Sequence, residues 1–338
     1  MSCPIIAFFN NKGGVGKTTL VYHLAWMLAE HDVRVLAADL DPQANLTAAF
    51  LDEEELENIW SSDGQRQTVF GSLQLLKKGI GDVALNESLQ TIGSSDNLFL
   101  LSGDLGLSEF EDTLSEVWPK CADGDERAFR VTSAFWRLLQ EGAAAKKADV
   151  ILMDLGPNLG AINRSALIAA DYLVVPLAPD LFSLQGLKNL GPTLQRWRGQ
   201  WKERLKANPV KSLGLPKGQM SPIGYVVLQH SQRLDRPVKA YAKWVKRIPE
   251  EYRESVLSEG GLFNPGKVDP YCLASLKHYR SLVPMAQEAR KPIFHLKPAD
   301  GAIGSHADAV REVFRDFRAL AAAIASKTGL QFDLNSGR

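Results

Sequence analysis

Residues 12 to 19 read Lys-Gly-Gly-Val-Gly-Lys-Thr-Thr, a spacing of glycine, lysine and hydroxyl residues that suits phosphate binding. Glycines in a turn between a strand and a helix let main-chain N–H groups point at phosphate oxygens, and the first turn of the helix adds the positive end of its dipole. Gly16, Lys17 and Thr18 match the pattern G-x-x-x-x-G-K-[ST], although Asn11 stands where that pattern has glycine. The segment therefore predicts a binding site for a polyphosphate.

Carboxylates follow two apolar segments elsewhere in the chain. Residues 34 to 38 precede Asp39 and Asp41, and residues 150 to 153 precede Asp154. In an open α/β sheet the carboxyl ends of parallel strands lie beside the phosphate-binding loop, so we expect these acids to come together there. Carboxylates at that edge suit Mg²⁺ and a water molecule aligned with a γ-phosphate.

Together these segments resemble the ParA/MinD family of ATPases, in particular its ParA branch. The deviant Walker A box of that family reads K-G-G-x-G-K-T-[ST], and Lys12 stands at its signature-lysine position. Residues 39 to 45 are similar to the family's D-x-D-P-Q-x-N box, and residues 154 to 176 resemble the stretch D-x-P-P-x-L-G through A-D-x-V-x-x-P. Gly156 replaces the first of two usual prolines, and we expect it to loosen the switch-like loop that senses the γ-phosphate.

The resemblance implies that two chains sandwich two ATP molecules. The nucleotide-binding residues would be Lys12, Gly13, Gly14, Val15, Gly16, Lys17, Thr18 and Thr19. Lys17 would neutralise charge on the β- and γ-phosphates, and Lys12 would cross the interface to the partner's nucleotide. The homodimer would therefore be the form that hydrolyses ATP.

The acids receive roles through the same resemblance. Thr18 would bind Mg²⁺ directly, Asp154 would bind it through water, and Asp39 would support the metal shell. Asp41 would orient the attacking water, which makes Lys12, Lys17 and Asp41 the catalytic candidates. Neither a further general base nor a separate arginine finger can be identified, so we expect slow intrinsic hydrolysis.

The elements that would position these residues alternate along the chain. Strands are predicted at residues 4–9, 33–38, 98–101, 149–153, 172–177 and 223–228. Helical stretches separate them, which predicts an α/β fold with a doubly wound, mainly parallel sheet, helices on both faces and P-loop NTPase architecture. We expect one domain over residues 1–338, with helical elaborations near 50–95 and 230–275 where the resemblance lapses. Apolar residues recurring at helical spacing over 310–324 predict a last helix that packs against the sheet.

The net charge is zero, but the charge is unevenly distributed. Residues 50–127 contain 17 acidic and 5 basic residues, whereas residues 194–250 contain 13 basic and 3 acidic ones. Basic side chains on a helix suit sequence-independent binding to a phosphate backbone. The DNA-binding candidates are Arg196, Arg198, Lys202, Arg233 and Arg280. A solvated helix face would have the same composition, and exposed tryptophans at Trp197 and Trp201 would instead indicate a protein interface.

The resemblance to the ParA branch implies non-specific DNA binding in the ATP state and a ParB-like or other partner protein that stimulates hydrolysis. The function would then be the partitioning or positioning of DNA or another cargo. One alternative is a regulatory or adaptor ATPase of a mobile-element or defence module that docks a protein through residues 197–244. A MinD-like membrane-positioning ATPase is disfavoured, because residues 330–338 lack a basic amphipathic pattern and no run of about 18 apolar residues occurs. We expect a cytoplasmic protein, associated with the nucleoid if it binds DNA.

Overall fold

The computed structural model describes residues 2–61, 67–85, 89–93, 95–228, 238–260, 268–277, 279 and 281–334, with side chains of the segment after 238 described from residue 243. Within these ranges eight strands form one sheet in the order β3-β4-β2-β5-β1-β6-β7-β8. The strands are β1 (Ile5–Phe8), β2 (Val35–Asp39), β3 (Leu89–Thr91), β4 (Leu98–Leu101), β5 (Val150–Asp154), β6 (Tyr172–Leu177), β7 (Ser221–Leu228) and β8 (Cys272–Leu276). Only the β3–β4 pair is antiparallel in this sheet. The predicted fold class, a doubly wound and mainly parallel sheet, is confirmed.

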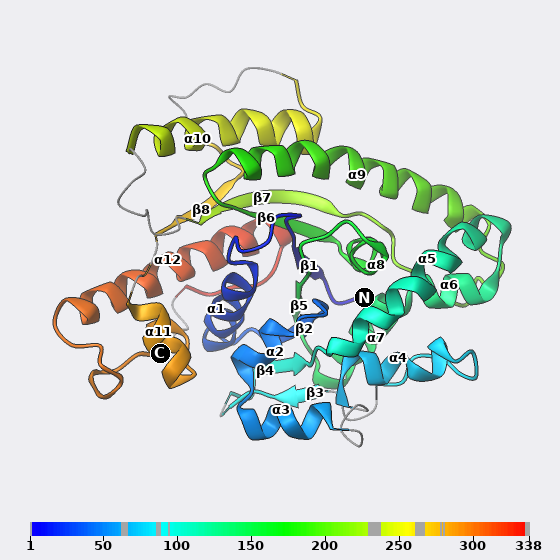
Figure 1. The fold of residues 1–338 in the computed structure, drawn as a ribbon, viewed down its shortest axis with the longest axis horizontal. Coiled ribbons are helices and arrows are strands. Elements are labelled where there is room, and N and C mark those ends of the chain that lie inside the picture. The colour runs from blue at the N-terminus through cyan, green and yellow to red at the C-terminus, as the bar shows by residue number, and fades with distance from the viewer. Residues whose placement is uncertain are drawn as a thin grey trace.

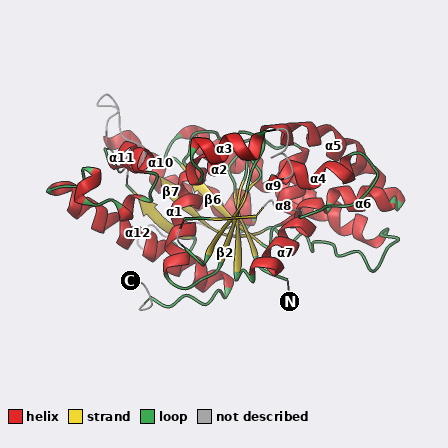
Figure 2. Cartoon of the chain, turned by 90° about the horizontal axis from the view of Figure 1, so that it is seen from below, coloured by secondary structure: helices red, strands yellow, loops and turns green. Residues whose placement is uncertain are grey.

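Helices cover both faces of the sheet (Figures 1 and 2). The helices are α1 (Lys17–Glu30), α2 (Asn45–Phe50), α3 (Glu53–Trp60), α4 (Val69–Lys77), α5 (Phe110–Lys120), α6 (Glu126–Thr132), α7 (Ala134–Lys146), α8 (Ala161–Ala169), α9 (Leu181–Lys206), α10 (Val238–Glu251), α11 (Leu282–Ala289) and α12 (Ser305–Thr328). Short 3-10 turns η2 (Leu105–Glu109), η3 (Cys121–Asp123), η5 (Ile293–His295) and η6 (Pro298–Asp300) and a π-helical turn η4 (Tyr252–Leu257) connect them.

Alternating residues of the central strand show how the sheet separates two cores. Ile5, Ala7 and Phe9 belong to a core that includes residues of α5 to α9. Ile6 and Phe8 belong to a second core that includes residues of α1, α11 and α12. Successive strand side chains point to opposite faces, so a strand buried on both faces is apolar throughout, as β1 is.

The last helix, α12, lies against α1 and β8 (Figure 1). Val313, Phe317, Leu320 and Ile324 form its buried stripe and are at most 2% exposed. The prediction that residues 310–324 form a helix packed into the core is confirmed.

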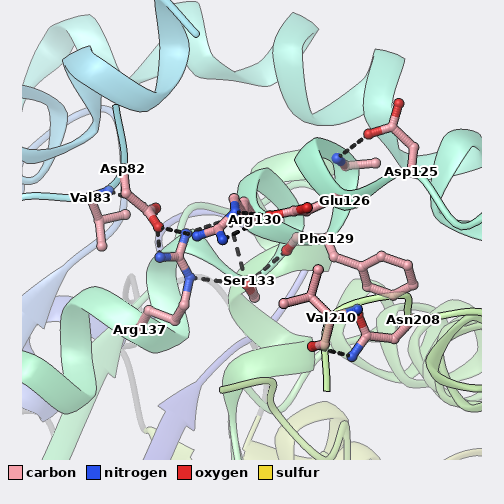
Figure 3. Close-up of polar contacts among 11 residues, drawn as sticks. Asp82, Val83, Asp125, Glu126, Phe129, Arg130, Ser133, Arg137, Asn208 and Val210 are labelled. Carbon is pink, nitrogen blue, oxygen red and sulfur yellow. Dashed lines mark hydrogen bonds and ion pairs between the residues drawn. The ribbon is translucent and has the colours of Figure 1, made fainter. Parts of the chain in front are cut away.

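The segment predicted as an elaboration near residues 50–95 contains α3, α4 and the short antiparallel strand β3. The sequence did not predict strand β3. A cluster of ion pairs connects the segment that follows α4 to α6 and α7 (Figure 3). Asp82 accepts from Arg130 and Arg137, each at 2.6 Å. Although partial burial opposes it, these guanidinium groups and the Val83 N–H lower the pKa of Asp82. Asp82 is thus an anchor for this elaboration rather than a candidate site residue.

The described part of the segment predicted as a second elaboration, near residues 230–275, contains α10, η4 and most of the edge strand β8, and α10 lies beside α9 (Figure 1). The interpretation of Trp197 and Trp201 as exposed is wrong. Trp197 is 4% exposed and Trp201 is fully buried. Trp201 stacks on Trp118 with ring centroids 6.1 Å apart, and its Nε1 donates to the Pro216 carbonyl at 2.9 Å. Trp201 also packs against Phe129 of α6, 6.0 Å between ring centroids. A pattern of basic residues around tryptophans does not reveal such long-range packing.

None of the helices that the structure describes is both long enough and apolar enough to cross a bilayer.

Candidate functional site

A cavity of about 780 Å³ opens at the carboxyl ends of the central strands. Its walls include Gly13 to Thr19, Asp41, and residues of α1 and α2. Part of the segment from Val283 to Ile293 closes the other side. The loop after β1 turns into α1 through Gly14 and Gly16, which have φ angles of 68° and 81°. These left-handed conformations favour glycine, so the glycine spacing of the loop is a requirement of its backbone.

Lys17 and Thr18 line this cavity, and both interact with Asp154, which lies behind them at the end of β5. Lys17 is 7% exposed, and burial lowers its pKa while the charges of Asp154 and Asp41 raise it. Thr18 Oγ1 donates to Asp154 Oδ2 at 2.6 Å. The first residues of α1 and the last residue of β5 are therefore in direct contact, as the sequence predicted from their positions at the same edge.

Asp154 has the features of a carboxylate prepared for a cation. It is fully buried, and its Oδ1 has no hydrogen-bond partner among the described residues. Burial, with the charge of Asp39, raises the pKa of Asp154 to about 8. An orphaned carboxylate oxygen beside a threonine hydroxyl fits Mg²⁺, which binds through one or two protein oxygens, substrate phosphates and water.

The titration of Asp154 gives a testable prediction. A buried acid whose pKa is raised is stabilising while protonated, and that contribution is lost as the pH rises toward and through about 8. We expect Asp154→Asn to raise the melting temperature in EDTA by a few degrees at pH 8 and by much less at pH 5.5. Thermal denaturation at the two pH values measures it, and an equal effect at both would show that Asp154 is ionised throughout.

Asp39, the last residue of β2, and Asp41, which follows it, differ in what they contact. Asp39 Oδ2 accepts from both the N–H and the hydroxyl of Thr47 at 2.8 Å, and its Oδ1 accepts from the Asp41 N–H at 3.3 Å. Burial raises the pKa of Asp39 to about 6. Asp41 lines the cavity, and its carboxylate accepts from the Gln43 N–H at 3.0 Å, the one side-chain hydrogen bond described for it. Asp39 thus connects α2 to β2, whereas Asp41 faces the cavity.

The loop after β5 lies close to Asp41. A Cβ atom built on Gly156 would lie 3.2 Å from Asp41 Oδ1, so glycine leaves room for that carboxylate. Asn163 Nδ2 donates to the carbonyls of Gly156 and Asn158 at 2.9 and 2.7 Å. Glu111 of α5 accepts from the N–H groups of the first two residues of α8. The predicted loosening of this loop is untested, and sequence reasoning missed Glu111 because it lies about 50 residues away.

Lys12 does not line the cavity of its own chain. Its amine pairs with Asp180, the N-terminal cap of α9, and lies 5.9 Å from the ring centroid of Phe182, which is 73% exposed. Although partial burial opposes it, the hydrogen bonds from Lys12 and the Ser183 N–H lower the pKa of Asp180. The sequence did not predict a role for Asp180. Its one local signal is the helix-capping pattern Asp-x-x-Ser.

The DNA-binding candidates occupy different environments. Arg196 and Lys202 are exposed on α9. Arg198 is partly buried and donates to the carbonyls of Gln219 and Met220 at 2.9 and 2.8 Å, so it serves the fold. Arg233 and Arg280 lie outside the described residues.

Comparison with known proteins agrees with this architecture. Residues 3–207 match a family model described as an AAA domain. The chromosome partitioning protein ParA of Caulobacter vibrioides is 29% identical over 206 residues, which cover 61% of this chain and 67% of that protein. Among curated relatives, the matched segment spans 42% of one and 65% of another, less than two thirds of either.

Solved structures resemble nearly the whole chain. Protein DIP2308 from Corynebacterium diphtheriae has a TM-score of 0.71 and 24% identity, with 96% of this chain and 98% of that chain covered. The ATP complex of McdA(D38A) from Cyanothece has a TM-score of 0.60 and 16% identity, with 98% of each chain covered. At these identities the likeness establishes the fold.

Proposed function

Because the chain belongs to the AAA-domain family of ParA/MinD-type P-loop ATPases, we propose that it dimerises around ATP, binds DNA non-specifically in that state and hydrolyses ATP slowly. The observation that carries this proposal is the pairing of a complete phosphate-binding loop with a signature lysine directed away from its own cavity. Such a lysine could act on a second chain once it leaves Asp180. The cycle would partition or position DNA or another cargo, as the name of the Caulobacter relative suggests.

The triphosphate of ATP would lie along Gly13 to Thr19, with the main-chain N–H groups and Lys17 binding its oxygens. Mg²⁺, when bound, neutralises charge on the β- and γ-phosphate oxygens. Thr18 and Asp154 would bind that ion. Asp39, which Thr47 holds in place through hydrogen bonds, would support the ligand shell of the metal.

Asp41 would orient the attacking water, because it is the carboxylate that faces the cavity from β2. Lys12 would leave Asp180 and complete the site of the partner chain. With few groups to activate water, turnover in the isolated protein would be slow, and a ParB-like or other partner protein would stimulate it. Binding to DNA would place the protein on the nucleoid.

A mobility-shift experiment tests the DNA-binding step. The Asp41→Ala protein, which should bind ATP without hydrolysing it, is mixed with a random-sequence duplex in ATP, in ADP and without nucleotide, at two salt concentrations. We expect a salt-sensitive shift in ATP alone. Absence of a shift in every state would contradict the DNA-binding proposal and favour an adaptor ATPase, for which an ATP-dependent, nuclease-resistant protein partner should then be found.

The exposed bases of α9 give a sharper form of the same test. Replacing Arg196 and Lys202 by glutamine should reduce the slope of log affinity against log salt by about 2, since each lost phosphate contact lowers it by about 1. The matched control replaces Lys78 and Lys147 by glutamine. It removes the same amount of charge at the ends of α4 and α7. An unchanged slope in the α9 variant would place the DNA surface elsewhere.

A further inference from the structure

His23, in the second turn of α1, connects two segments that are 270 residues apart. It is 4% exposed, and its Nδ1 lies 2.8 Å from the Thr19 carbonyl within the same helix. Its Nε2 lies 3.1 Å from the main-chain nitrogen of Ile293, at the start of η5. The helix that follows the phosphate-binding loop is thereby joined directly to the carboxyl-terminal part of the chain.

These two contacts define the tautomer of His23. A main-chain N–H can only donate, so Nε2 accepts from Ile293 and carries no proton. Nδ1 then carries the proton and donates to the Thr19 carbonyl. Burial lowers the pKa of His23 to about 4, so the ring remains neutral near pH 7. The ring also stacks on Phe317 of α12, with centroids 5.0 Å apart.

The segment that His23 contacts forms part of the cavity wall. Arg290, Lys291 and Ile293 line the cavity together with the phosphate-binding loop. Arg290 Nη1 donates to the Leu51 carbonyl at 2.7 Å, which fastens one end of the segment to the end of α2. The Ile293–His23 hydrogen bond fastens the other end to α1. Without this hydrogen bond the Ile293 N–H would be buried and unpaired, which costs free energy. Displacement of the segment would expose the N–H and relieve that cost.

We propose that His23 is a positioning residue for the nucleotide, which sets the distance between the phosphate-binding loop and the wall formed by Arg290 to Ile293. This inference rests on the proposed ATP site. Because the phosphate-binding loop would hold the triphosphate, we assign the nucleoside part of ATP to this wall, which lines the same cavity. Loss of the Ile293 contact should therefore weaken binding of ATP and leave binding of inorganic triphosphate unchanged.

Two substitutions separate the two nitrogen atoms of the ring. In His23→Asn the side-chain amide can replace Nδ1 and donate to Thr19, but it cannot reach Ile293. In His23→Gln an amide oxygen can replace Nε2 and accept from the Ile293 N–H. We expect His23→Asn to raise the Kd for a fluorescent ATP analogue about 10-fold, because it leaves a buried N–H unpaired, and His23→Gln to restore most of the affinity. Competition with inorganic triphosphate measures the phosphate half of the site in the same samples.

His31→Leu is the matched control. His31 is the C-cap residue of α1 and is also buried, and its Nδ1 also contacts the carbonyl four residues earlier. Its ring packs against Phe314 of α12, but His31 does not line the cavity. We expect this variant to bind ATP as the unmodified protein does.

The outcomes distinguish the inference from the function on which it rests. A folded His23→Asn protein that binds ATP with unchanged affinity would overturn the inference. Equal weakening of ATP and inorganic triphosphate would also overturn it, since that result indicates general damage to the fold. If the unmodified protein binds neither ligand, the proposed ATP site itself is wrong.

Discussion

Replacing Lys17 by alanine should weaken ATP binding about 100-fold or more, because a charge-assisted hydrogen bond to a buried phosphate is worth roughly 3 kcal/mol. The physical reason is the charge around the cavity. Lys17 is 7% exposed and lies close enough to Asp41 and Asp154 to feel both charges. Without its amine, the phosphates would face these carboxylates with only main-chain N–H groups to bind them. Titration with a fluorescent ATP analogue in the presence of Mg²⁺ measures the effect.

The melting temperature without nucleotide is the control that shows whether this variant is folded. The buried amine of Lys17 carries a desolvation cost, so Lys17→Ala should not lower the melting temperature of the protein without nucleotide by more than a few degrees. The increase in melting temperature that ATP causes in the unmodified protein should disappear. A Lys17→Ala protein that binds ATP within about 10-fold of normal would show that the loop binds phosphate mainly through its backbone.

Lys12→Ala should have the opposite effect on binding and turnover. ATP binding should stay within a few-fold of normal, whereas turnover should fall at least about 100-fold. A loss of this size is expected when a cation is supplied in trans to a phosphoryl transfer site. Lys12 does not line its own cavity, so its loss should not disturb nucleotide binding within one chain. The ATP-dependent dimer should be lost as well. Light scattering on a sizing column measures dimerisation, and phosphate release measures turnover. Normal hydrolysis by Lys12→Ala would show that the signature-lysine assignment is wrong.

Asp180→Asn is the matched control for Lys12. Asp180 Oδ1 accepts from the Ser183 N–H at 2.8 Å as the N-cap of α9, and asparagine caps helices equally well. The substitution therefore removes the ion pair with Lys12 and leaves the cap in place. We expect dimerisation and turnover to be retained within a few-fold. Loss of both would indicate that Asp180 takes part in the interface itself.

Local patterns pointed to segments that the structure brings together, because each of them is short. The loop after β1, the acids after β2 and the acid that ends β5 are each contiguous in the sequence. The sequence did not predict strand β3, which has three residues and none of them buried. It did not predict strand β8 either, because a serine interrupts its short apolar run and only its last residue is buried. Neither has the continuous hydrophobic run of a central strand.

The sequence by itself determined the family, the parallel sheet and the residues of the phosphate-binding loop, because strand–loop–helix geometry is local and needs glycine and lysine at defined positions. Only the tertiary structure decided the partners of these residues. It joined Lys12 to Asp180, Glu111 to the start of α8 and His23 to Ile293, and it buried the tryptophans of α9. These contacts join residues 50 to 270 positions apart, and packing of helices on the sheet brings such residues together without a local signal.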